Sequence, residues 1–275
     1  MDGAFILTDG YFSKNNDKIF TSGIFEKLLI REPVRSIRNQ LMFWNEHMML
    51  INFQLQLLNR QIPVFMTHDA KELKRQVERT LVKNKLFKSA RVDLFFFKND
   101  EKTGYAVKTT DMESAGYELN QEGISLAPFH KITKANSPLS SLRSGSEPYW
   151  NILQAYRPSA TTELILQNTE GCLLEVPERN LYLICKKKVH TTAPESGAYI
   201  SPAKKIIQQI CEEKKLPFIE QLYLSPDDLL GADEVFLAGS LHGIQWVKGF
   251  EMKRYLSKIT REIHQAFLHK TSMEK

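Results

Sequence analysis

The sequence predicts a two-domain protein of the mixed α/β (α+β) class. Strand-like runs and amphipathic helical runs alternate along the chain, and its 275 residues are enough for two modest domains. Residues 121–148 are rich in Ser, Pro and Gly, a composition typical of a connection between domains. We therefore expect one domain over residues 1–130 and a second over residues 131–275.

The first half begins with a predicted β-hairpin over residues 4–12, AFILTDGYF, in which Asp9-Gly10 is the turn signal. Four further segments follow, and their apolar spacing and polar boundaries define them. They are an apolar run that stops at Pro33, an amphipathic helix over 41–62, a helix over 67–85 with Thr67 as its N-cap, and a strand over 90–100.

The second half alternates in the same way. Its elements are a helix that begins at Pro148, hairpins over 163–176 and 180–192, a helix over 201–217, a helix-strand-loop-strand unit over 224–247 and a closing helix over 251–270. Ser201 can cap the helix that follows it, and Pro202 suits a first helical turn.

Composition argues against several classes of protein. Hydrophobic residues make up 42% of the chain, and no run approaches the roughly 20 apolar residues that span a bilayer. The three cysteines have no CxxC spacing and the amino terminus has no signal-peptide pattern, so we expect a cytoplasmic protein with reduced thiols and no membrane partner. The seven histidines lack metal-ligand spacing, so we expect no metal site.

The net charge of +5 is spread along the chain and points only weakly to an acidic ligand. The basic runs KNKLFKSAR and KKK lie in no recognisable nucleic-acid module, and solvated surfaces explain them adequately. A nucleic-acid-binding protein is therefore the most remote hypothesis, and we expect no nucleic-acid partner.

Three features could carry chemistry, and each has an ordinary structural explanation beside it. The loop AGSLHGI, residues 238–244, could bring backbone N–H groups to an anion, or it could be a tight turn. The helix start at Ser201 could bind an anion, although most helix starts bind water. Glu175 could orient a heterocyclic nitrogen, or it could be a residue that reaches solvent at a strand end.

Several stretches together resemble the class IV aminotransferases, the fold-type-IV pyridoxal phosphate enzymes. This family includes branched-chain and D-amino-acid transaminases and 4-amino-4-deoxychorismate lyase. The resemblance is most specific in ADEVFLAGSLHGIQWV and in LILQNTEGCLLEVPERNLYLI, and weaker in SGIFEKL and NEHMMLINFQLQLL. It implies a small N-terminal α/β domain, a larger C-terminal mixed-sheet or barrel-like domain, a cleft between domains and a homodimer.

The resemblance also implies roles for individual residues. Glu175 would face the pyridine nitrogen of pyridoxal 5′-phosphate, while the Ser240–Leu241 loop would meet the cofactor phosphate. The segment from Gly197 to Ser201 would offer further backbone N–H groups to that phosphate. The ligand would be a small amino acid, carboxylate or phosphate.

The chain departs from the family where the Schiff-base lysine should stand. After SPLSSL the family has this lysine, and here the residue is Arg143, while an alignment backwards from the next helix puts Gly145 there. A guanidinium group stays protonated and does not replace a primary amine in Schiff-base chemistry. Two arginines of the family are also replaced, one by Phe43 and one by Ile200.

These departures predict a degenerate homologue that lacks the catalytic lysine and a phosphate-binding arginine, and they argue against tight binding of pyridoxal phosphate. The alternative is an active transaminase or aminodeoxychorismate lyase that uses a displaced lysine. Lys131 and Lys134 are the nearest lysines, and both fall in the expected linker.

Overall fold

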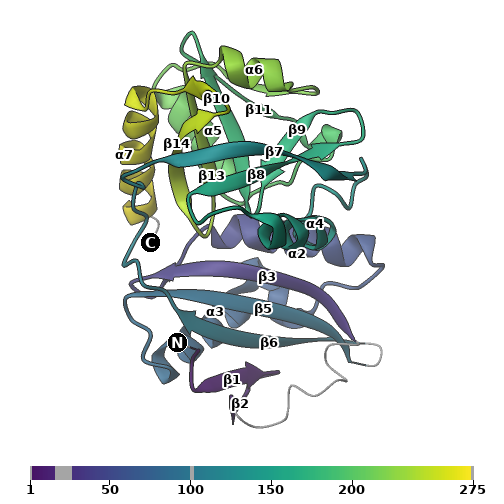
Figure 1. Ribbon diagram of the computed structural model, residues 1–275. Coiled ribbons are helices and arrows are strands. Elements are labelled where there is room, and N and C mark those ends of the chain that lie inside the picture. Colours follow the sequence, from purple (N-terminus) through teal and green to yellow (C-terminus); the bar gives the residue numbers. More distant parts are fainter. Residues whose placement is uncertain (1, 16–26, 100–101, 274–275) are drawn as a thin grey trace. The chain divides into compact units, whose positions relative to one another are not determined.

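The computed structural model describes residues 2–15, 27–99 and 102–273, and the chain divides into two compact units, Met1–Gly116 and Tyr117–Lys275. Each unit combines a sheet with helices, as the predicted α/β class requires (Figure 1). The second unit is the larger of the two.

The first unit contains a six-stranded antiparallel sheet of order β2-β1-β6-β5-β3-β4. Apolar side chains of two helices, such as Ile51 and Leu73, share a buried cluster with strand residues such as Val92. The elements are β1 (Phe5–Thr8), β2 (Tyr11–Lys14), β3 (Leu28–Ile37), β4 (Gln40–Leu41), α2 (Trp44–Leu57), the 3-10 turn η1 (Val64–Met66), α3 (Thr67–Lys83), β5 (Ser89–Asn99) and β6 (Lys102–Asp111).

Local turn chemistry confirms the first predicted hairpin. Asp9 and Gly10 have φ values of 45° and 90°, which match the turn that joins two twisted antiparallel strands. The prediction that an apolar run stops at Pro33 is wrong, because β3 continues through Pro33 to Ile37. Among the residues that the structure describes, β3 borders only the two-residue strand β4 on one side, and a proline is tolerated at such an edge.

The predicted helices of this unit are α2 and α3, but Thr67 does not cap α3. The cap residue is Met66, and the Thr67 hydroxyl donates a hydrogen bond to the Val64 carbonyl at 2.7 Å. His68 to Ala70 have left-handed φ values, so the regular helix begins after them. The family-like motif Gly23-x-Phe25-Glu26 lies outside the described residues.

The second unit contains a nine-stranded mixed sheet that closes on itself. Strands β10, β13, β14, β7, β8 and β9 are paired in that order, and β9 pairs with β10 to complete the ring. The sheet is mixed because β7 runs parallel to both β14 and β8, whereas most other pairs are antiparallel. This closed arrangement is the barrel-like domain that the family resemblance implies.

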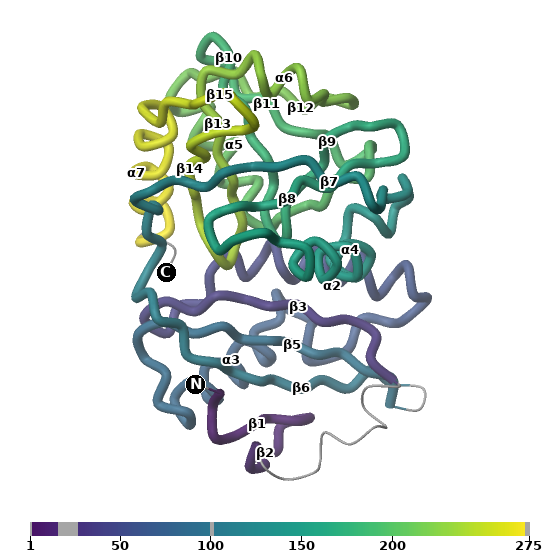
Figure 2. The backbone as a smooth tube through the Cα atoms, in the orientation of Figure 1, coloured from purple at the N-terminus to yellow at the C-terminus, as the bar shows by residue number. Residues whose placement is uncertain are grey.

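The backbone tube in Figure 2 follows the order of elements in this unit. The strands are β7 (Ile124–Lys134), β8 (Thr162–Asn168), β9 (Leu173–Val176), β10 (Arg179–Cys185), β11 (Lys188–Thr192), β12 (Phe218–Gln221), β13 (Glu234–Gly239), β14 (Gly243–Phe250) and β15 (Lys253–Arg254). The helices are α4 (Arg143–Tyr156), η2 (Pro194–Ser196), α5 (Lys204–Glu213), α6 (Pro226–Gly231) and α7 (Lys258–Met273).

The boundary expected between residues 130 and 131 falls inside β7, and the whole of β7 belongs to the second unit. The Ser- and Pro-rich composition of residues 121–148 coincides with two local features. The β7–β8 register shifts between Pro128 and Thr133, and a loop over residues 135–142 then leads into α4. Both features lie within the second unit, so this composition reflects an irregular strand and a loop of that unit.

Most elements predicted for the second half are confirmed. The two hairpins are β8–β9 and β10–β11, and the unit over 224–247 is α6, β13, a tight turn and β14. α4 begins at Arg143, five residues before the expected start at Pro148. Ser201 is not the N-cap of α5, since that helix begins at Lys204 after Ala203.

Candidate functional site

Glu175 is a fully buried carboxylate in the barrel-like sheet. It lies in β9, where it pairs with Leu166 of β8 and with Asn180 of β10. Its Oε2 accepts a hydrogen bond from the backbone N–H of Tyr199 at 2.8 Å, and its Oε1 accepts one from the Trp150 indole at 3.3 Å. A buried charge of this kind requires a countercharge, because burial removes the carboxylate from water.

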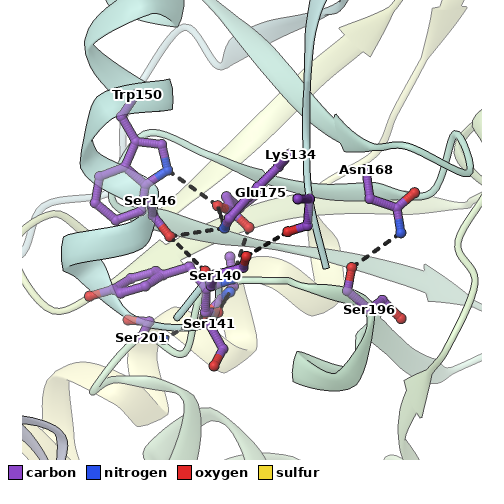
Figure 3. Close-up of polar contacts among 12 residues, drawn as sticks. Lys134, Ser140, Ser141, Ser146, Trp150, Asn168, Glu175, Ser196 and Ser201 are labelled. Carbon is purple, nitrogen blue, oxygen red and sulfur yellow. Dashed lines mark hydrogen bonds and ion pairs between the residues drawn. The ribbon is translucent and has the colours of Figure 1, made fainter. Parts of the chain in front are cut away.

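Lys134 supplies that countercharge. Expected in a linker, it is the last residue of β7, and its Nζ lies 2.5 Å from Glu175 Oε1 and 2.9 Å from Ser146 Oγ (Figure 3). The Lys134 and Glu175 side chains are both 0% exposed. Burial lowers the pKa of the Lys134 ammonium, and Glu175 opposes this shift.

The loop after β7 and the first turns of α4 hold this ion pair in place. Ser146 Oγ donates to the Ser140 carbonyl at 2.9 Å, and Ser140 Oγ donates to the Ala135 carbonyl at 2.5 Å (Figure 3). Arg143, Ser146 and Trp150 are spaced by three and four residues, so they share the buried face of α4. One helix face therefore carries three polar contacts of the site.

Arg143 has acidic partners other than Glu175. Its guanidinium forms a partly buried ion pair with Glu178, lies 3.6 Å from Glu147 and stacks 5.2 Å from the centre of the Trp150 ring. The side chain is 4% exposed. Trp150 thus contacts both groups: its ring faces the residue at the expected lysine position, and its indole N–H donates to the carboxylate that was expected to face the cofactor ring.

Glu178 connects Arg143 to the turn between β13 and β14. Its second carboxylate oxygen lies 3.1 Å from His242 Nε2. Burial lowers the pKa of His242, and the hydrogen bond with Glu178 opposes this shift. The backbone of the same segment approaches the turn closely, because a Cβ on Gly239 would lie 2.3 Å from the Glu178 carbonyl oxygen.

Ser240 and Leu241 are buried in this turn, and their position has a packing explanation. The Ser240 carbonyl accepts a hydrogen bond from the Tyr117 hydroxyl at 2.5 Å. Gly243 has a φ of 66°, and a Cβ there would contact the Tyr117 ring at 2.7 Å. The small residues of the loop are therefore required for packing, and a role in phosphate binding stays a prediction.

Ser201 is linked to Glu175 through Asn180. Asn180 Oδ1 accepts the Ser201 backbone N–H at 3.2 Å, and its Nδ2 donates to the Tyr199 carbonyl at 2.6 Å. Ser201 Oγ accepts the Ala203 N–H at 3.3 Å, which closes a turn before α5. The segment 199–201 is thus held against the β9–β10 pair, near Glu175.

Sequence reasoning singled out Glu175, whose role stays a prediction, but it did not name most of the residues that contact it. Lys134, Ser146 and Trp150 contact Glu175 or each other, and Glu178 and His242 extend the network to the β13–β14 turn. The spacing of Arg143, Ser146 and Trp150 was a usable signal, since it predicts one helix face. The contact of Lys134 with Glu175 depends on strand register across 41 residues, which spacing does not predict.

The described residues offer neither a metal-binding cluster nor a membrane-spanning helix. Residues 2–15, 27–99 and 102–273 contain no group of three or more His, Cys, Asp or Glu side chains that could hold a metal ion. Within the same ranges, we find no helix long and apolar enough to cross a membrane.

Comparison with protein families identifies the class of protein that this fold and site define. The model of the amino-transferase class IV family matches residues 23–250, which is most of the chain. The chain therefore belongs to the class IV aminotransferase family. Comparison with curated proteins found no match.

Solved structures of the family share the fold of this chain. Branched-chain amino acid aminotransferase of Escherichia coli is 18% identical and has a TM-score of 0.80, covering 99% of this chain and 96% of that chain. A putative 4-amino-4-deoxychorismate lyase from Legionella pneumophila is 18% identical and has a TM-score of 0.74, covering 87% of this chain and 90% of that chain. The T.th. branched-chain amino acid aminotransferase with pyridoxamine 5′-phosphate is 14% identical, with a TM-score of 0.80, and covers 99% of this chain and 95% of that chain. At these identities the likeness establishes the fold alone.

Proposed function

We propose that this chain is a class IV aminotransferase-family protein that keeps the fold of the family but has lost its lysine-based pyridoxal phosphate chemistry. One observation carries this proposal. The carboxylate of Glu175, which should be available to a cofactor ring, forms a buried ion pair with Lys134 at 2.5 Å. The residue at the expected lysine position, Arg143, forms a separate ion pair with the partly buried Glu178.

The residues of the site do not fit the covalently bound cofactor of the family. A Schiff-base lysine and a carboxylate partner must meet opposite ends of the pyridine ring, since the aldehyde carbon and the ring nitrogen are para to each other. Lys134 and Glu175 instead contact each other directly, with both side chains buried. Arg143 lacks a primary amine and therefore cannot take the place of that lysine.

A second candidate function rests on Lys134 itself. This ammonium is buried and its pKa is lowered by burial, which increases the fraction of neutral, nucleophilic amine. An active transaminase or lyase with Lys134 as a displaced lysine requires this amine to leave Glu175. The 2.5 Å ion pair and the hydrogen bond to Ser146 both oppose that movement.

We further propose a small carboxylate or phosphate as the ligand class, a homodimer as the assembly and the cytoplasm as the location. The net charge of +5 favours an anionic ligand, and the three cysteines are free, in keeping with a reducing compartment. Analytical ultracentrifugation tests the homodimer, and a monomer at micromolar concentration would refute that part of the proposal.

The chemistry is tested by adding pyridoxal phosphate to the purified protein, recording the absorbance spectrum, and then reducing with borohydride and mapping peptides by mass spectrometry. We expect no band at about 410–420 nm and no specific phosphopyridoxyl-lysine. Lys131 is an internal control for nonspecific labelling, because its side chain is exposed. Stoichiometric labelling of Lys134, well above that of Lys131, would establish the second candidate function instead.

A further inference from the structure

We propose that Lys134 is an internal substitute for a protonated heterocycle. Its ammonium makes the contact with Glu175 that a protonated ring nitrogen would make, and it thereby excludes such a ring from the site. This inference rests on the proposed loss of covalent chemistry and identifies the residue that blocks the site.

The hydrogen bonds of Glu175 support this assignment. The carboxylate receives three donors: the Lys134 ammonium, the Trp150 indole N–H and the Tyr199 backbone N–H. Two of these donors are neutral, so Lys134 is the donor that brings a positive charge. A protonated heterocyclic N–H would bring one donor and one positive charge to the same oxygen, and it could not do so while the ammonium is there.

The surroundings of Lys134 would suit a flat ring once the lysine side chain is removed. The indole of Trp150 lies beside Glu175 and packs edge-on against the ring of Tyr199, with centroids 4.8 Å apart. Both rings are buried, and Ser146 Oγ would lose its ammonium donor and face the vacated volume. The vacated volume would then have an aromatic wall, a hydroxyl and an unneutralised carboxylate.

Removing the Lys134 side chain should therefore create a binding site for a cationic heterocycle. We choose pyridoxamine 5′-phosphate as the probe, because it has no aldehyde and cannot form a Schiff base with any lysine. Lys134→Ala should bind it about 10- to 100-fold more tightly than the wild-type protein, the range expected for one charge-assisted hydrogen bond. Propylammonium is a second probe, since it restores the three deleted carbons and the charge.

Isothermal titration calorimetry with both probes tests the proposal, and two variants serve as controls. Lys134→Met fills the volume without a charge and should gain no affinity for either probe. The double variant Lys134→Ala/Glu175→Gln has the volume but no carboxylate, and it should lose most of the gain. If Lys134→Ala does not fold, Lys134→Ser replaces it, because its hydroxyl and an added water can solvate Glu175.

Three outcomes would overturn the proposal: a folded Lys134→Ala protein that gains no affinity, a double variant that keeps the full gain, or wild-type protein that itself binds pyridoxamine 5′-phosphate with a Kd of about 1 μM or less. The third outcome decides the matter even if both small-residue variants fail to fold. These readouts are independent of the proposed function. Reducible labelling of wild-type protein with pyridoxal phosphate refutes the loss of covalent chemistry, whereas the titrations concern noncovalent binding alone.

Discussion

The buried ion pair between Lys134 and Glu175 makes a quantitative prediction about stability. Both side chains are 0% exposed, so replacing either one leaves the other charge without a counterion and without water. Removal of one partner of such a pair typically costs about 3–5 kcal/mol. We expect Lys134→Met to lower the free energy of unfolding by this amount, because Glu175 keeps only the neutral donors of Trp150 and Tyr199.

Glu175→Gln should be comparably destabilising, since an amide cannot neutralise Lys134 and its NH₂ group would face one of the donors that now bind the carboxylate. The double variant Lys134→Met/Glu175→Gln buries no net charge. It should therefore be at least about 2 kcal/mol more stable than the sum of the single effects predicts, which is a coupling typical of contacting charged residues.

Urea unfolding followed by circular dichroism and tryptophan fluorescence measures these differences. Lys131→Met is the matched control: this exposed lysine lies over the Tyr156 ring, and its loss should change stability by less than about 1 kcal/mol. A cost below about 1 kcal/mol for Lys134→Met, or strictly additive effects in the double variant, would refute the electrostatic reasoning.

Four further predictions follow from the same structure. Arg143→Lys places a lysine where the family resemblance expects one, but it should yield no reducible adduct with pyridoxal phosphate, because Lys134 still occupies the carboxylate of Glu175. Mass mapping that finds an adduct at residue 143 would contradict this. Burial raises the pKa of Cys211 to about 12, so iodoacetamide should modify this thiol in the native protein far more slowly than the partly exposed Cys185, and equal rates would be inconsistent with the packing. Glu234 accepts the backbone N–H groups at the start of α7, and Glu234→Ala should cost about 1.5–3 kcal/mol in urea unfolding. Burial lowers the pKa of Lys134 in the folded protein. At pH values between this lowered pKa and the ordinary lysine pKa, the unfolded chain binds one more proton than the folded chain, so the free energy of unfolding rises with pH. Lys134→Met should remove this rise, and an unchanged dependence of stability on pH would contradict the prediction.

Local signals in the sequence predicted most of the individual elements. The Asp9-Gly10 turn, the α2 periodicity and the two hairpins of the second half all follow from residues that are close together in the chain. The predicted element boundaries at Pro33 and Thr67 were wrong because the backbone there depends on residues that are distant in the chain. The edge position of β3 and the left-handed backbone after Thr67 are set by tertiary contacts, and these override local preference.

The site was predictable only in part. The family-like motif drew attention to Glu175, and the segment around Arg143 suggested that this residue stands at the lysine position; both roles stay predictions. The pairing of β7 with β8 and of β8 with β9, which brings the end of β7 toward Glu175, has no local signature. For this reason Lys134 was assigned to a linker, although it provides the charge that neutralises the buried carboxylate.

A crystal structure of the protein grown with millimolar pyridoxal phosphate would show whether Lys134 keeps a cofactor ring away from Glu175. We expect Lys134 Nζ to stay within hydrogen-bonding distance of Glu175, with no cofactor ring between them. A cofactor ring that contacts Glu175 through its nitrogen, with Lys134 displaced or covalently attached to it, would contradict the account.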